Sequence, residues 1–129
     1  MLDNIAGILI TGGWWRGSPL SLVELIREDW TTCELPSLPV GRSSHTQVGL
    51  EACGGYLTPG IGTSCVTFVA GKWSSSHSLS VSRSGHVSWA SYPGGVLLMG
   101  GSASPRSTEL LSPTSSTTTA KFELQYDAG

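Results

Sequence analysis

The stretch that decides the fold is RSGHVSWASYPGGVLLMGG, at residues 83–101. It begins with an arginine-to-histidine step, Arg83-Ser84-Gly85-His86, and it ends with an apolar run and the glycine pair Gly100-Gly101. The preceding part of the chain has the same order, because Arg42-Ser43-Ser44-His45 is followed by Gly54-Gly55. The two histidines are 41 residues apart, which indicates a repeated structural unit.

Glycine pairs follow an apolar stretch at three places, Gly12-Gly13, Gly54-Gly55 and Gly100-Gly101, at intervals of 42 and 46 residues. A tryptophan follows the first two pairs at nearly the same distance. Trp30 is 17 residues after Gly13, and Trp73 is 18 residues after Gly55. Three independent markers therefore share one period.

Each unit also has a short β-like run after its glycine pair, at residues 22–26, 65–68 and 108–111. No stretch shows a sustained apolar period of 3.6 residues, so we predict an all-β chain. We expect one domain of three units with four short strands each, at approximately residues 1–40, 41–81 and 82–129. A twisted sheet buries both faces only when neighbouring sheets stack on it, and this period favours the blades of a β-propeller.

Residues 83–101 resemble the kelch repeat, in which an Arg-x-Gly-His step leads to an apolar strand ending in Gly-Gly, a further strand and an outer-strand tryptophan. The resemblance covers the chain from Ile8 to about Tyr126, and its strength lies in the ordered combination of markers. It implies about three four-stranded antiparallel blades of a partial kelch-type β-propeller.

The units depart from this pattern in three places. His45 is 9 residues before Gly54, so the inner hairpin of the second unit is shortened or lacks a regular first strand. The third unit has no tryptophan, and we expect Phe122 to take its place on the outer strand. The first unit lacks the Arg-x-Gly-His strand. About three blades are too few to close a ring, which usually takes four or more. We therefore expect two open apolar blade faces, which suits a fragment, a homo-oligomer that completes a propeller ring, or a poorly soluble product.

Composition and motifs disfavour several classes of function. Only 12% of the residues are charged and the net charge is −2, so the chain lacks the basic surface that nucleic acids demand. Its apolar runs are far shorter than the roughly 20 residues of a membrane span, and its beginning does not resemble a secretory signal. It has no phosphate-binding loop, zinc spacing or nucleophile elbow, so we expect no enzyme activity, metal or other cofactor.

Three cysteines, Cys33, Cys53 and Cys65, leave at least one thiol without an intramolecular partner, and the compartment stays open. Cys53 precedes a glycine pair, and Cys65 belongs to the next expected strand. The two residues could therefore face each other on neighbouring strands, joined by a disulfide or present as two buried thiols.

Some repeated residues are expected to be structural. The three glycine pairs permit positive φ and a close backbone turn, while Trp30 and Trp73 are expected to pack between blades. His45 and His86 are repeat-equivalent, and we expect them to form hydrogen bonds near a strand start rather than to bind metal.

Other residues are candidates for ligand contact. Trp14, Trp15 and Arg16 follow the first glycine pair and are of the types that dominate interface hot spots. The resemblance places Arg42 and Arg83 on the ligand-binding surface, where an arginine can grip a carboxylate, and Arg106 completes a modest basic set. The alternative is that the tryptophans pack on a neighbouring blade and that the arginines bind backbone carbonyls.

The leading hypothesis is a non-enzymatic module that binds a protein or an acidic peptide through its loop face. A second hypothesis is a fragment of a propeller enzyme resembling galactose oxidase or sialate mutarotase, with its active centre in missing blades. A third is an inactive truncated product.

Overall fold

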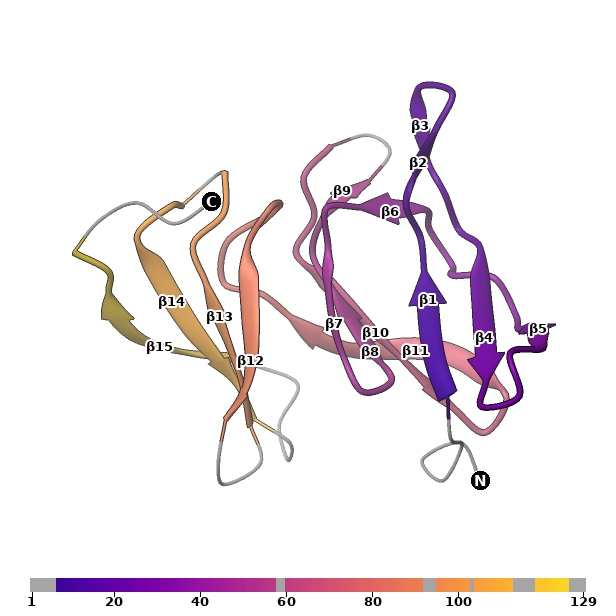
Figure 1. Ribbon diagram of the computed structural model, residues 1–129. Helices are drawn as coiled ribbons and strands as arrows, with labels where there is room; N and C mark the ends of the chain where they lie inside the picture. The colour runs from indigo at the N-terminus through magenta and orange to yellow at the C-terminus, as the bar shows by residue number, and fades with distance from the viewer. Residues whose placement is uncertain (1–6, 58–59, 92–94, 103, 113–117, 126–129) are drawn as a thin grey trace.

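The computed structural model describes residues 7–57, 60–91, 95–102, 104–112 and 118–125 (Figure 1). These residues form fifteen β-strands, and every pairing between them is antiparallel. The prediction of an all-β chain is confirmed for this part of the protein, which contains no helix. In the same part, no helix is long and apolar enough to cross a membrane.

Two four-stranded sheets contain most of the later part of the chain. The middle sheet has the order β11-β10-β8-β7 and contains β7 (Thr46–Val48), β8 (Glu51–Cys53), β10 (Ser64–Val69) and β11 (Lys72–Ser78). The third sheet has the order β12-β13-β14-β15 and contains β12 (Val87–Ser91), β13 (Gly95–Met99), β14 (Ser107–Leu111) and β15 (Thr118–Glu123). The middle sheet therefore has a first strand, β7, although this strand is short.

The first sheet has three strands, in the order β1 (Gly7–Thr11), β4 (Val23–Arg27) and β5 (Thr32–Glu34). This sheet lacks the fourth strand of the general pattern, since no strand among the described residues takes the place that β7 and β12 hold in the other two, and this agrees with the absence of the Arg-x-Gly-His strand from the first unit. Two small sheets complete the chain: β2 (Trp14–Trp15) pairs with β3 (Ser18–Pro19), and β6 (Arg42–Ser43) pairs with β9 (Tyr56–Leu57).

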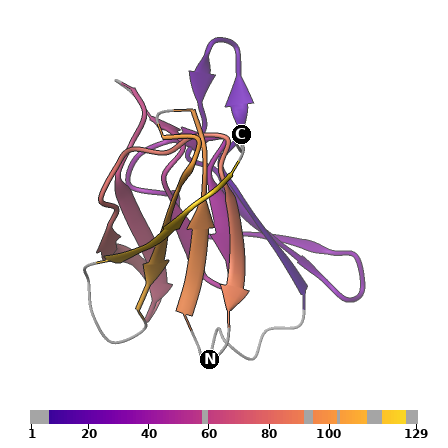
Figure 2. The ribbon, with the colours of Figure 1, turned by 90° about the vertical axis from the view of Figure 1, so that its left-hand side faces the viewer.

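The three sheets stand side by side, with the middle sheet covered on both faces (Figures 1 and 2). One apolar cluster lies between the first and middle sheets, and a second lies between the middle and third sheets. The first contains Val23, Leu38, Ala52 and Val66 with Leu9, Leu35 and Trp73 packed on it, and the second contains Cys53, Cys65, Leu79, Leu98 and Leu111 with Val96.

Alternation along the strands explains why the middle sheet contributes to both clusters. Ala52 and Cys53 are consecutive, so their side chains point to opposite faces of β8. Both are buried, Ala52 against the first sheet and Cys53 against the third. The β-like runs predicted at residues 22–26, 65–68 and 108–111 coincide with β4, β10 and β14 within one residue at each end.

The predicted packing of Trp30 is wrong, because its side chain is 80% exposed. Trp30 lies in the turn between β4 and β5 and has a φ of 68°, which belongs to the left-handed region. The N–H of Trp30 donates to the carbonyl of Arg27, and the N–H of Arg27 donates to the carbonyl of Thr31. The loop between Arg27 and Thr31 is therefore one residue longer than the two-residue turn between β10 and β11. Trp73, by contrast, packs on the cluster between the first and middle sheets and contacts the Phe68 ring at 5.1 Å.

Candidate binding site at the hairpin end of the sheets

The two repeated arginines lie inside the protein, where their guanidinium groups bind backbone carbonyls. Arg42 Nη1 donates to the carbonyls of Gly54 (3.1 Å) and Ser64 (2.9 Å). Arg83 Nη1 makes the equivalent bonds to Gly100 (2.8 Å) and Ser107 (3.2 Å). The side chains of Arg42 and Arg83 are therefore not at the surface, in contrast to the expected ligand contact.

Arg83 has an additional partner that Arg42 lacks among the described residues. Its Nε donates to Glu109 Oε1 at 2.9 Å, and both side chains are fully buried. Burial alone would raise the pKa of Glu109. Hydrogen bonds from Thr118, from the N–H of Ser80 and from Arg83 lower this pKa below its usual value, so the carboxylate stays charged.

The glycine pairs are held against these arginines by main-chain contacts. The N–H of Gly13 donates to the carbonyl of Arg42 (2.9 Å), and the N–H of Gly55 donates to that of Arg83 (2.7 Å). Gly54 has a φ of 66°, and a Cβ added there would lie 2.8 Å from the carbonyl oxygen of Arg83. The expected structural role of the pairs has a clear physical basis at this position.

The two equivalent histidines link neighbouring sheets. His45 Nε2 lies 2.9 Å from Thr11 Oγ1, and His86 Nε2 lies 2.8 Å from Thr46 Oγ1. Burial, followed by the charge of Arg42, lowers the pKa of His45. Burial, followed by the charge of Arg83, lowers the pKa of His86 to about 4. His86 is therefore neutral at pH 7, as a hydrogen-bonding residue requires.

The β2–β3 hairpin projects from one end of the stack of sheets (Figures 1 and 2). At this end, the turns after the first two glycine pairs line an open depression. It has a volume of about 570 Å³. Trp14 and Tyr56 contribute aromatic rings whose centroids are 5.7 Å apart. The remaining lining residues are small: Gly13, Ser43, Ser44 and Ser84.

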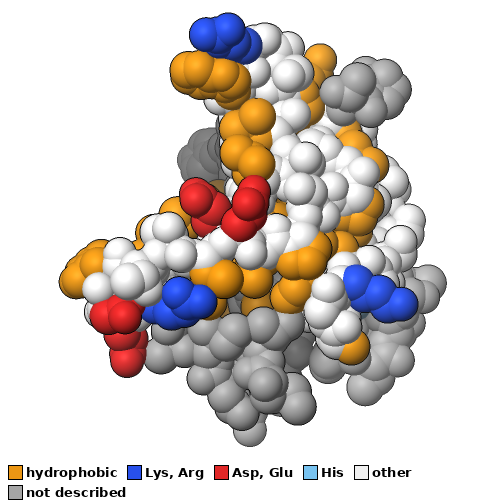
Figure 3. Space-filling view, turned by 90° about the vertical axis from the view of Figure 1, so that its right-hand side faces the viewer, with side chains coloured by type: hydrophobic (Ala, Val, Ile, Leu, Met, Phe, Trp, Pro, Cys, Tyr) orange, Lys and Arg blue, Asp and Glu red, His pale blue; other side chains and the backbone are white. Residues whose placement is uncertain are grey.

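The β2–β3 hairpin presents the three residues predicted for ligand contact. Trp14 and Trp15 are 53% and 61% exposed, and Arg16 is exposed beside them. The Arg16 guanidinium lies over the Trp15 ring, 5.5 Å from its centroid. Seen from the side of the first sheet, this hairpin carries a basic group and apolar side chains at the end of the molecule (Figure 3). Arg106 is exposed, donates to the carbonyl of Leu124 and does not line the depression.

Tyr56 was not among the predicted contact residues, although the repeat could have indicated it. It follows Gly54-Gly55 directly, as Trp14 follows Gly12-Gly13. Residues at equivalent positions of adjacent sheets lie next to each other, which is why the two rings meet. The serines that complete the depression come from the two arginine-to-histidine steps.

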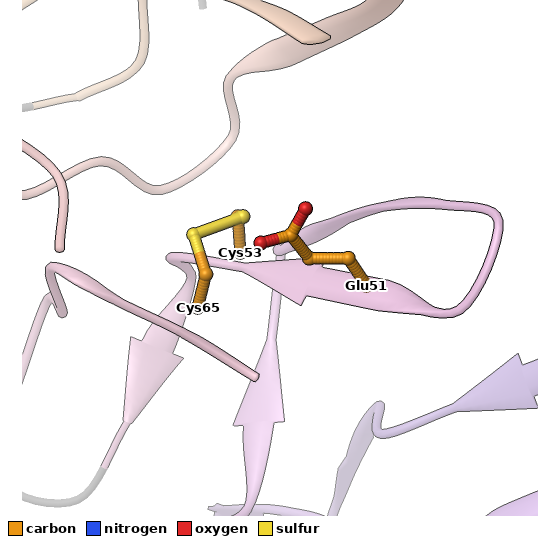
Figure 4. Close-up of side chains that lie close together, drawn as sticks. All are labelled: Glu51, Cys53 and Cys65. Atoms are coloured by element: carbon orange, nitrogen blue, oxygen red, sulfur yellow. A yellow bond between two sulfur atoms is a disulfide. The ribbon is translucent and has the colours of Figure 1, made fainter. Parts of the chain in front are cut away.

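Cys53 and Cys65 are direct partners on β8 and β10 and are joined by a disulfide, one of the two alternatives that the sequence left open (Figure 4). Their sulfur atoms and a Glu51 carboxylate oxygen lie within 4.8 Å of one another. The disulfide accounts for this proximity and leaves no thiolate there to bind a metal. The Glu51 carboxylate contacts Ser76 Oγ and His77 Nδ1, each at 2.5 Å. Cys33 is a free, half-buried cysteine.

Comparison of the chain with models of known protein families finds no match, and comparison with curated protein sequences finds none.

Proposed function

We propose that this chain is a non-enzymatic binding module, a segment of a kelch-type propeller that binds a protein segment in the depression between Trp14 and Tyr56. The observation that supports it is an open hollow with two exposed aromatic residues and a floor of glycine and serine. Aromatic side chains supply large contact area at low cost in conformational entropy, and they are enriched among interface hot spots.

The proposed propeller architecture is supported by contacts that recur from unit to unit. The N–H of the first glycine of each pair donates to a carbonyl at the beginning of β4, β10 or β14. The acceptors are the carbonyls of Leu22, Ser64 and Ser107. The arginine side chains make equivalent bonds within the second and third units, and the second glycine of the first two pairs donates to the arginine carbonyl of the next unit. Recurring contacts between adjacent sheets are the basis of repeat architectures.

The ligand class follows from the composition of the hollow and its rim. The floor is uncharged, and serine hydroxyl groups can both donate and accept hydrogen bonds to a peptide backbone. Arg16, on the adjacent hairpin, is the exposed cation that supports a preference for an acidic residue in the bound peptide. The case for acidity now depends on Arg16, since Arg42 and Arg83 are buried.

A peptide-display selection tests the proposal. The purified chain is panned with a random peptide library, and binders to the Trp14→Ala/Tyr56→Ala variant are removed. An enriched peptide should lose about tenfold or more in affinity with Trp14→Ala, measured by calorimetry. Val40→Asp, at an exposed apolar residue outside the hollow, is the matched control and should bind as the wild type does.

Arg16→Glu separates the acidic preference from binding itself. It should weaken an acidic peptide and leave a neutral one unchanged. If panning enriches no peptide that depends on Trp14 or Tyr56, the proposed site is refuted, whatever the chain binds elsewhere.

A further inference from the structure

Both ends of the stack of sheets carry apolar faces that nothing covers within the described residues. Leu9 packs toward the middle sheet, so Ile8 and Ile10 point away from it by alternation, and they are 56% and 44% exposed. At the other end, Val87 and Trp89 are 51% and 59% exposed on the outer face of the third sheet. Hydrophobic side chains are visible across the outer face of the first sheet in Figure 3.

The outer face of the first sheet corresponds to a face that is buried in the other two sheets. The residues two positions before each glycine pair are Ile10, Ala52 and Leu98. Ala52 packs toward the first sheet and Leu98 toward the middle sheet, and both are 0% exposed. Ala52 and Leu98 therefore each pack against the preceding sheet of the stack. Ile10 is the equivalent residue with no preceding sheet among the described residues.

The outer face of the third sheet corresponds to the faces of the first and middle sheets that pack against the next sheet of the stack. The residues directly before each glycine pair are Thr11, Cys53 and Met99. Thr11 hydrogen-bonds His45 of the next unit, and Cys53 packs with Leu98 of the next sheet. Met99 pairs with Val87 in β12 and lies on the outer face of the third sheet. This face therefore matches the surfaces that cover a following sheet.

We propose that two copies of this chain associate head to tail, with the outer face of each third sheet covering the outer face of the other copy's first sheet. The contact repeats a packing that the chain already uses twice internally. A heterologous contact of this kind closes into a ring when its rotation permits. Two copies contribute three large sheets each, and this total lies within the roughly 4 to 8 blades of closed propellers.

Glu24 makes the proposal sensitive to a single substitution. It lies two residues after Leu22, as Val66 follows Ser64 and Glu109 follows Ser107. Val66 and Glu109 are buried against the preceding sheet, and Glu109 is paired with Arg83. Glu24 is exposed in the single chain, so covering it in the dimer would desolvate its carboxylate. Replacing it with the valine of the middle sheet should strengthen the association.

The first measurement is the solution mass by light scattering over a range of concentrations. The expected mass is twice the 13.5 kDa of one chain, with a dissociation that appears on dilution. Glu24→Val should lower the dissociation constant by about tenfold. A folded chain that remains monomeric at every concentration, or a polydisperse series of larger species, overturns the closed dimer.

Two variants then distinguish head-to-tail contact from contact between identical faces. Ile10→Asp and Trp89→Asp should each give monomers with unchanged circular dichroism, because both residues are exposed in the single chain. Mixing them restores one wild-type contact, so the mixture should form a dimer. Val40→Asp should leave the dimer intact. If only one of the two variants dissociates the dimer, or if the mixture stays monomeric, the head-to-tail arrangement is wrong.

Discussion

Replacing Arg83 by methionine should be among the most destabilising single substitutions in the described part of the chain. The change removes the Nε bond to Glu109 (2.9 Å) and the Nη1 bonds to the carbonyls of Gly100 and Ser107. It leaves the Glu109 carboxylate fully buried without its cation. Breaking a buried ion pair from one side costs about 3–5 kcal/mol. The remaining hydrogen bonds from Ser80 and Thr118 favour the lower end, about 3 kcal/mol.

The structure supplies two internal comparisons for this prediction. Arg42→Met also removes bonds to two carbonyls but leaves no carboxylate behind, so it should cost about 1–3 kcal/mol. The double variant Arg83→Met/Glu109→Leu removes both charges and should be more stable than Arg83→Met alone.

The assay is urea unfolding at pH 7, followed by far-ultraviolet circular dichroism and tryptophan fluorescence, with the free energy of unfolding taken from linear extrapolation. The reasoning fails if Arg83→Met costs no more than Arg42→Met. It also fails if the double variant is no more stable than the single one, because the buried carboxylate would then not be the source of the loss.

Two further predictions concern His86 and the glycine pairs. Because the pKa of His86 falls from 6.5 to about 4 on folding, the unfolded chain takes up its proton first, and stability should drop by about 3 kcal/mol between pH 6.5 and pH 4. Urea unfolding across this range measures the slope, which His86→Gln should reduce; an unchanged slope would assign it to other groups. Gly54→Ala should destabilise the fold more than Gly85→Ala. Both glycines have a positive φ (66° and 68°), but a Cβ meets a backbone carbonyl at Gly54 and nothing within 4 Å at Gly85. Thermal unfolding of the two variants compares them, and equal losses would mean that backbone conformation alone matters.

The repeat could be predicted from the sequence because its markers contact one another. Gly13 bonds to Arg42, and Gly55 bonds to Arg83, so the glycine pairs and the arginine steps recur together. The positions of β4, β10 and β14 followed from this period. A contact that is made again at each junction restricts the same residue types at the same spacing, which is why it is visible in a single sequence.

The surroundings of individual side chains could not be predicted in this way. Trp30 and Trp73 have nearly equal spacing from their glycine pairs. Trp73 nevertheless lies in β11 and pairs with Phe68 of β10, whereas Trp30 lies in the longer turn between β4 and β5. Turn length shifts the register of everything that follows, and spacing alone does not reveal it. For the arginines the sequence left two alternatives open, a ligand contact and bonds to backbone carbonyls, and the structure shows the second. Their acceptors are backbone carbonyls, which every sequence contains and no residue type identifies.

The buried arginines still bear on the proposed site, because Arg42 joins the two turns that carry its aromatic rings. Its carbonyl accepts from the N–H of Gly13, directly before Trp14, and its side chain donates to the carbonyl of Gly54, two residues before Tyr56. The side chain of Arg83 bonds to the carbonyls of Gly100 and Ser107 instead. The carbonyl of Arg83 accepts from the N–H of Gly55, but Arg83→Met leaves this main-chain bond in place.

The two arginine variants should therefore rank in opposite orders for stability and for binding. Arg83→Met should cost more stability, whereas Arg42→Met should weaken the selected peptide more, by about tenfold, since it loosens the Tyr56 turn and raises the entropy cost of binding. Calorimetric titration of both variants, well below their unfolding transitions, measures this. If the loss of affinity follows the loss of stability instead, Arg42 does not position the site. If Arg42→Met weakens binding more than Arg83→Met although it costs less stability, Arg42 positions the site without touching the ligand. An arginine with a purely structural role would not show this reversed order.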